Sequence, residues 1–116
     1  MPSLVEHTGK AVVETAESLN ADLILLFSEG THIARCISKF RPKIPVFFCT
    51  TSARVVKEMQ LYKCINAILI PSFHGLDNFI QRVISIKLKS GEAQKGHSIV
   101  CVHGEFESYL IKVVKI

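Results

Sequence analysis

The stretch that decides the fold is Leu23-Ile24-Leu25-Leu26-Phe27, followed directly by Ser28-Glu29-Gly30-Thr31-His32. The first five residues form the most apolar run in the chain, which is typical of a strand buried on both faces. Large apolar residues then recur at helical spacing, at Ile33, Ile37 and Phe40. The pattern predicts a buried strand, a short polar loop and a helix, the unit from which helix-covered parallel sheets are built.

The loop between this strand and this helix has two possible roles. Free backbone N–H groups and the positive end of the helix dipole meet at a helix start, so an anion can bind there. Ser28 and Thr31 also carry hydroxyl groups that are common helix N-caps. A capping role and an anion site are therefore both open.

The rest of the chain repeats the alternation of helix and strand. Ser3 and Glu6 have the spacing of a capping box, and the prolines after residue 41 end the second helix. The pattern predicts four helices: residues 4–19, residues 33–40, a helix through Val55, Val56 and Met59, and a helix from Leu76 that Gly91 closes. After the first strand, it predicts further strands over residues 46–49, 66–70, 98–103 and 109–114.

The last two expected strands are separated only by a turn from Gly104 to Glu107, so they must pair as an antiparallel hairpin. Lys112 and Lys115 suit an edge position for the final strand. We therefore expect one domain over residues 1–116. It should be a three-layer α/β fold with a mainly parallel five-stranded sheet, helices on both faces and an antiparallel last edge strand.

Composition places the chain among globular domains, with 116 residues, 48% hydrophobic and 21% charged. No apolar run approaches the roughly 18 residues that suggest a membrane span, and the N-terminus lacks a signal-peptide pattern, so we expect a cytoplasmic protein. The four cysteines are widely spaced beside apolar neighbours, which favours reduced core thiols over disulfides or a zinc site.

The net charge of +4 comes mainly from residues 82–116, which carry six Lys/Arg against three Asp/Glu. This excess lacks an arginine cluster and interleaved aromatics, so a solvated basic face is favoured over nucleic-acid binding. We expect neither a nucleic-acid partner nor a membrane partner.

Ligands of such a sheet bind at the carboxyl ends of its strands, where the loops after the first two strands concentrate hydroxyl groups. We expect these loops to form a double anion cradle, although each hydroxyl group could instead cap a helix. The candidate binding residues are Ser28, Gly30, Thr31, His32, Thr50, Thr51 and Ser52.

Three histidines, His32, His74 and His103, fall in loops at the same edge. A metal site or a general base could be built from them with Glu29 or Glu105 nearby. However, their spacing matches no metal or catalytic-triad signature, and no phosphate-loop, dinucleotide or nucleophile-elbow motif is present. We therefore expect no catalytic residue and no metal ligand.

One stretch carries a family resemblance. Residues 34–42 read A-R-C-I-S-K-F-R-P, followed by Ile44-Pro45-Val46 and Thr50, and residues 95–100 read K-G-H-S-I-V. This pattern resembles the C-terminal domain of pyruvate kinase, in which a Thr/Ser-rich loop leads into a helix reading A-R-x-I-S-K-Y-R-P. The similarity covers nearly the entire chain.

The resemblance implies a regulatory and subunit-association role in the glycolytic enzyme that transfers phosphate from phosphoenolpyruvate to ADP. In that family the reaction takes place in a separate (β/α)8 barrel, which is absent from this chain and holds the magnesium and potassium ions. No cofactor is therefore expected here. The implied partners are a homo-oligomer or the remainder of a pyruvate kinase, and a phosphorylated effector bound at the loop after the first strand.

The effector loop departs from the family pattern T-x-S-G-x-[ST]. Ser28 keeps the first hydroxyl group, but Gly30 and Ile33 replace hydroxyl residues, while Thr31 replaces the glycine. Glu29 adds a negative charge where a phosphate would lie. The loop over residues 104–108 is also shorter than in sugar-bisphosphate-responsive members and bears two acids, so both departures argue against a bisphosphate effector.

Two alternatives to the pyruvate kinase role remain open. The first is a free-standing module that binds a small anion or phosphometabolite at the strand ends. The second is a small hydrolase or transferase that uses the strand-end histidines, which requires their rings to converge.

Overall fold

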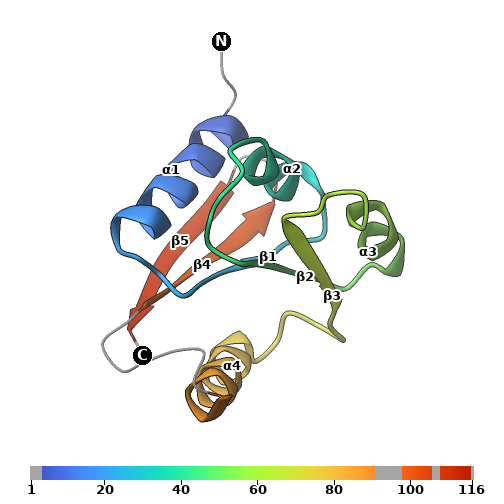
Figure 1. Cartoon of the computed structure of the whole chain (residues 1–116). Coiled ribbons are helices and arrows are strands. Elements are labelled where there is room, and N and C mark those ends of the chain that lie inside the picture. The colour runs from blue at the N-terminus through green and yellow to red at the C-terminus, as the bar shows by residue number, and fades with distance from the viewer. Residues whose placement is uncertain (1–3, 91–97, 106–107, 116) are drawn as a thin grey trace.

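The computed structural model describes residues 4–90, 98–105 and 108–115. Helices and strands alternate through the first seven elements, and the last two strands follow without a helix between them (Figure 1). The elements are α1 (Leu4–Ser18), β1 (Leu23–Phe27), α2 (His32–Lys39), β2 (Val46–Thr50), α3 (Ala53–Met59), β3 (Ile65–Leu69), α4 (Leu76–Ser90), β4 (Ser98–Glu105) and β5 (Ser108–Lys115).

The strands form one sheet in the order β3-β2-β1-β4-β5. Neighbouring strands are parallel from β3 to β4, and β5 alone runs antiparallel, at the edge beside β4. β1 lies at the centre, where Ile24 is in register with Val46 on one side and Val100 on the other. The structure confirms the expected mainly parallel five-stranded sheet with an antiparallel last edge strand.

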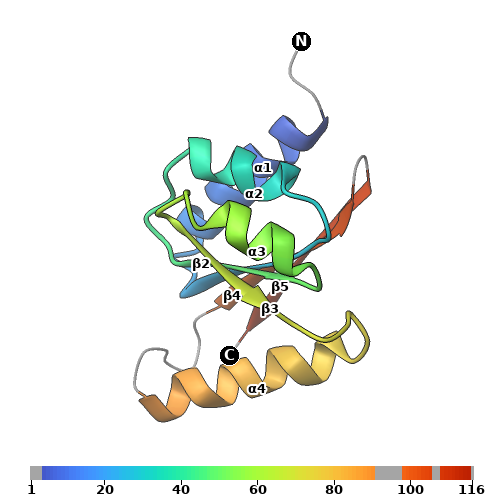
Figure 2. The same cartoon turned by 90° about the vertical axis from the view of Figure 1, so that its right-hand side faces the viewer.

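Helices cover both faces of the sheet, as the sequence predicts. α1, α2 and α3 pack on one face, and α4 packs on the other (Figures 1 and 2). Alternate residues of β1 belong to two separate cores: Ile24 and Leu26 join the core under α1–α3, whereas Leu23, Leu25 and Phe27 join the core under α4. The run from Leu23 to Phe27 is uninterruptedly apolar because both of its faces are buried.

The first helix ends one residue earlier than predicted. Leu19 was expected on the apolar face of the helix, but it lies beyond the last helical residue and its side chain is 48% exposed. Asn20 adopts a left-handed conformation with φ of 50°, and Ala21 N–H donates to the Ala16 carbonyl at 2.9 Å. This is a Schellman ending, which turns the chain away from the helix axis before Leu19 can reach the core.

The second helix shows a similar difference. Ile33 and Ile37 are buried as expected, but Phe40 follows the last helical residue and is 42% exposed. Arg41 then has a φ of 43°, which redirects the chain toward β2. The helical spacing of Phe40 therefore predicted a core contact that the end of the helix prevents.

The strand boundaries differ by one or two residues. β3 begins and ends one residue before the expected range, and β4 continues through the start of the predicted turn to Glu105, which is in register with Ser108. The predicted cap at Ser3, the predicted helix stop at Gly91 and the turn residues Phe106 and Glu107 lie outside the described residues.

The longest helices, α1 and α4, have 15 residues each. Within the described part of the chain, no helix combines the length and hydrophobicity needed to cross a membrane.

Candidate functional site

The two hydroxyl-rich loops lie next to each other because β1 and β2 are parallel neighbours. Phe27 at the end of β1 is in register with Cys49, and Ser28 N–H donates to the Cys49 carbonyl at 3.3 Å. The loop over residues 28–31 therefore begins beside Thr50, at the carboxyl edge of the sheet where ligands of such folds bind.

The loop after β1 uses its hydroxyl groups differently from the capping prediction. Ser28 is buried, and its Oγ accepts a hydrogen bond from Gly30 N–H at 3.3 Å within the loop. Thr31 occupies the N-cap position of α2, but its side chain makes no capping hydrogen bond. Of the two roles left open for this loop, a side-chain cap on α2 is therefore not made by Ser28 or Thr31.

In the loop after β2, one hydroxyl group does cap a helix. Ser52 Oγ accepts a hydrogen bond from Val55 N–H at 3.4 Å, at the start of α3. Thr50 is fully buried, and its Oγ1 accepts Ser52 N–H at 3.3 Å. The capping role is therefore confirmed for Ser52, while Thr50 holds the loop in shape.

A side-chain hydrogen bond joins the two loops. The Thr51 hydroxyl donates to the Glu29 carboxylate, although the two residues are far apart in the sequence. Glu29 is exposed, whereas Thr51 is half-buried. The carboxylate therefore lies between the two proposed halves of the anion cradle and takes one of the hydroxyl donors that an anion would need.

The structure thus brings all seven candidate binding residues to one edge of the sheet, on two loops tied together. They differ in access, because Ser28 and Thr50 are buried while Thr31, Thr51 and Ser52 are half-buried. His32 is exposed at the first residue of α2. The groups with solvent access at this edge are therefore Gly30, Thr31, His32, Ser52 and the Glu29–Thr51 pair.

The three histidines predicted at this edge, His32, His74 and His103, have different surroundings. His103 is in register with Phe27, and its ring lies 5.5 Å from the Phe73 ring and 6.4 Å from the Phe27 ring between centroids. His32 and His74 are exposed. Among residues 4–90, 98–105 and 108–115, no three His, Cys, Asp or Glu side chains are grouped so that they could hold a metal ion.

The four cysteines are free thiols, and three of them are buried, as the sequence predicts. Burial raises the pKa of Cys49 to about 12 and, with the same main cause, the pKa of Cys101 to about 11. These thiols stay protonated at neutral pH. They therefore act as small core residues and not as nucleophiles.

Sequence reasoning missed a hollow between α4 and the β4–β5 hairpin. It consists of two pockets, one of about 140 Å³ bordered by Phe27 and His103 and one of about 340 Å³ bordered by β5. Asp77 and Lys112 line both pockets, and Lys112 Nζ lies 3.7 Å from Asp77 Oδ1. No sequence pattern indicates this hollow, because it arises from the packing of a helix against a hairpin distant from it along the chain.

Comparison with known proteins identifies the family. The family model for the pyruvate kinase alpha/beta domain matches residues 6–114. The pyruvate kinase of Eimeria tenella is 37% identical over 114 residues, which cover 94% of this chain and 22% of the relative. The pyruvate kinase of Dictyostelium discoideum is 31% identical over 105 residues, covering 90% of this chain and 21% of the relative.

A solved structure shares the fold. The pyruvate kinase of Cryptosporidium parvum, solved in complex with ADP, superposes with a TM-score of 0.83 at 26% identity, covering 99% of this chain and 24% of that one. This chain spans about a fifth of the length of the curated relatives it matches. Sequence, family model and fold agree over almost all of the described residues, so the chain belongs to the pyruvate kinase alpha/beta domain family.

Proposed function

We propose that this chain acts as the non-catalytic regulatory and subunit-association domain of a pyruvate kinase. The observation that carries the proposal is the family match over residues 6–114, together with the small share of each relative that it covers. Phosphoryl transfer from phosphoenolpyruvate to ADP, and the magnesium and potassium ions that serve it, then belong to the part of the enzyme outside this match. The glycolytic role also implies a cytoplasmic location.

An assay of pyruvate formation tests the catalytic half of this proposal. The purified 116-residue protein is incubated with phosphoenolpyruvate, ADP, magnesium and potassium, and pyruvate is detected by coupled oxidation of NADH. We expect no turnover above the rate without protein, whereas full-length Eimeria tenella pyruvate kinase serves as the active control. Turnover that copurifies with the 116-residue chain would show that the chain is itself an enzyme.

The association role is supported by the outer edge of the sheet. β5 has no strand on its far side among the described residues. Apolar side chains of this strand remain open to solvent, with Leu110 68%, Val113 43% and Ile111 37% exposed. An exposed apolar edge strand pairs readily with another chain. The partner in this proposal is a second copy of the domain, or another part of a pyruvate kinase.

The regulatory role rests on the strand-end loops. Ser28, Gly30, Thr31 and His32 at the start of α2, and Thr50, Thr51 and Ser52 beside them, would bind the phosphate of a small effector. The Glu29 carboxylate opposes that binding, because it is a like charge bonded to one of the donors. We therefore propose a weak site for a monophosphorylated ligand and not for a bisphosphate.

A free-standing phosphometabolite binder is the second candidate, favoured by the hydroxyl-bearing side chains that β1 and β2 bring to the same edge of the sheet. Thermal unfolding with phosphate, sugar phosphates and nucleotides separates the readings. A ligand present at a hundredfold excess over its Kd would raise the stability by about 2.7 kcal/mol. Stabilisation by a free metabolite, without any self-association, would favour the free-standing module. Self-association without any ligand effect would leave only the structural role.

A further inference from the structure

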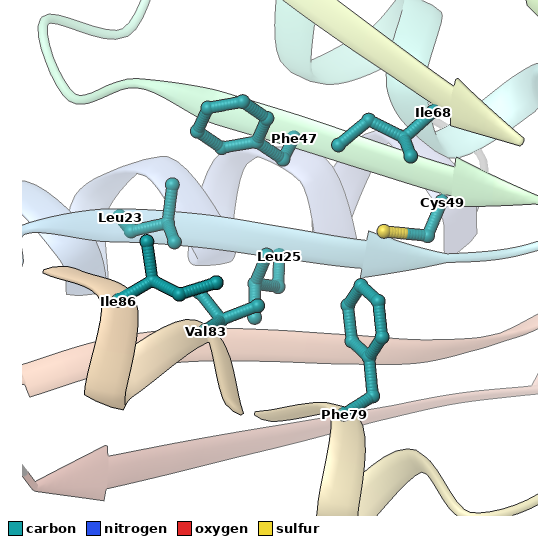
Figure 3. A pocket seen from close by; sticks show the side chains of 8 residues that line it. All are labelled: Leu23, Leu25, Phe47, Cys49, Ile68, Phe79, Val83 and Ile86. Atoms are coloured by element: carbon teal, nitrogen blue, oxygen red, sulfur yellow. The ribbon is translucent and has the colours of Figure 1, made fainter. Parts of the chain in front are cut away.

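An apolar pocket of about 150 Å³ lies between α4 and the sheet, on the face opposite α1–α3. Side chains from β1, β2, β3 and α4 face one another across it (Figure 3). Among the described residues, α4 is the only helix on this face (Figure 2), and Phe47 on β2 and Ile68 on β3 belong to the pocket lining. It is separate from the loops at the strand ends.

Among the described residues that line this pocket, none has a charged, hydroxyl or amide side chain. The one side-chain heteroatom in this described lining is the sulfur of Cys49, a fully buried thiol that burial keeps protonated. A phosphate, a carboxylate or an ammonium group would lose its hydration shell in this pocket without gaining a hydrogen bond from a side chain. The pocket therefore selects against the charged ligands proposed for the strand ends.

The dimensions and the aromatic content of the wall define the ligand further. An apolar cavity of about 150 Å³ stays dry and accommodates a single benzene ring in another protein. Here Phe47 on β2 and Phe79 on α4 line the same space as Cys49 (Figure 3). Ring edges and sulfur atoms both make favourable contacts with an aromatic ring.

The pocket also has an entrance. Ile86 on α4 is 65% exposed and Ile68 on β3 is 37% exposed, and both contribute to the lining. These two aliphatic side chains therefore border the pocket on its solvent-exposed side, whereas Cys49 in the same lining is fully buried. We propose that this pocket binds a small uncharged aromatic molecule, from one six-membered ring up to the size of indole.

The test is a titration of the 116-residue protein with indole, followed by ¹H–¹⁵N NMR, with benzoate as the charged ligand of similar size. We expect saturable shifts centred on the amides of Cys49, Phe79 and Val83 with indole, and none there with benzoate. Val83 is half-buried in the wall, so Val83→Phe should fill the pocket and weaken indole binding about tenfold or more. Leu61→Phe adds the same ring at a position that is 85% exposed and remote from the pocket, and should leave the affinity unchanged.

A second variant keeps the test decisive if Val83→Phe fails to fold. Ile86→Glu changes only the exposed rim and places a carboxylate at the entrance, so it should also weaken indole binding while the spectrum stays folded. Indole shifts that do not saturate, or that both variants leave intact, would overturn the proposal. It would equally fail if indole did not bind and Ile86→Glu abolished self-association, because the pocket would then receive an apolar side chain from another protein molecule.

Discussion

Glu29, in the loop after β1, reaches the hydroxyl-bearing loop after β2 at the edge of the sheet. Its carboxylate accepts a hydrogen bond from Thr51, so a phosphate entering between the loops would meet both a like charge and an occupied donor. The behaviour of the whole rim toward anions therefore depends on this one side chain.

We predict that Glu29→Gln makes the protein bind inorganic phosphate about fivefold more tightly or better, because removing a like charge at close range is worth about 1 kcal/mol or more. Isothermal titration calorimetry at low ionic strength measures the change. Glu58→Gln is the matched control, since Glu58 is an exposed carboxylate on α3 that pairs with Arg54 Nη1 at 3.0 Å. Equal phosphate affinities in the wild type and Glu29→Gln would show that the Glu29 charge does not weaken phosphate binding.

Cys49 gives the protein a sensitivity to alkaline pH. Its pKa is about 12 in the folded state against 9.0 when exposed, so the unfolded chain loses the thiol proton first as the pH rises. Stability from the buried neutral thiol is complete below pH 9 and is lost between pH 9 and 12.

We therefore expect Cys49→Ala to lower the free energy of unfolding at pH 8. Above the unfolded pKa the wild type loses about 1.4 kcal/mol of stability per pH unit, and the variant does not, so the difference between the two should shrink by about 2 kcal/mol by pH 10.5. Urea unfolding at the two pH values provides the measurement. Ile99→Val truncates the same core without a titratable group, so its deficit should not change with pH. A constant deficit for Cys49→Ala would contradict the raised pKa.

The positions of the site residues were predictable, but their individual roles were not. Parallel neighbouring strands end at one edge, so the hydroxyl groups after residues 27 and 49 had to meet there. Whether a hydroxyl group caps a helix, turns inward or pairs with a carboxylate depends on loop torsion angles, which sequence spacing does not encode. Ser52 and Thr31 occupy the same kind of position and behave differently for this reason.

That difference leads to a prediction about two helices. Ser52→Ala removes the Oγ that accepts Val55 N–H and should destabilise the protein by about 1 kcal/mol. Thr31→Ala, which removes a side chain with no capping hydrogen bond, should cost distinctly less. Chemical denaturation of both variants decides the matter. If Thr31→Ala were the more damaging change, the hydroxyl group of Thr31 would stabilise α2 after all.

The contact between α1 and α2 depends on a glycine. Gly9 is buried, and a Cβ atom built there would lie 3.1 Å from Cys36 Cβ and 3.5 Å from the Ile37 nitrogen. Alanine favours the helix over glycine by about 1 kcal/mol, which offsets a small displacement of α2. A larger side chain would have to separate the two helices.

We predict that Gly9→Ala changes the free energy of unfolding by less than about 1 kcal/mol, whereas Gly9→Leu lowers it by about 1–3 kcal/mol. Ala11→Leu, on the exposed side of α1, serves as the control for adding a leucine and should stay within about 0.5 kcal/mol. Thermal or urea unfolding measures all three. If Gly9→Leu were as stable as Ala11→Leu, α1 and α2 would not be in close contact at this point.

Helices and strands were predictable where burial alone determines the pattern. The apolar run of β1 and the spacing of Ile80 and Ile84 in α4 indicated their elements correctly, because these side chains fill the core. The misplaced residues, Leu19 and Phe40, both follow a helix end where the backbone turns away. Periodicity cannot register such a turn, because it counts residues and not backbone torsion angles.

In the molecule as a whole, the sheet has two edge strands, β3 and β5, and the proposed association uses β5. We predict that the protein self-associates at micromolar concentration and that the double substitution Ile111→Lys and Val113→Lys yields monomers, since added like charges on an edge strand oppose pairing. Sedimentation equilibrium measures the effect. Leu61→Lys, at a site that is 85% exposed, should associate as the wild type does. An edge-strand variant that still associates would exclude β5 as the contact.

The place of β1 at the centre of the sheet also has a consequence for the order in which the chain folds. β2 reaches β1 after one short helix, but the other side of β1 is closed only by β4, near the end of the chain. During synthesis the ribosome releases β1 long before β4, so one edge of the most apolar strand stays unpaired until β4 emerges. Ribosome pausing between α4 and β4 would therefore expose the nascent chain to aggregation, and chaperone protection is needed most during that interval.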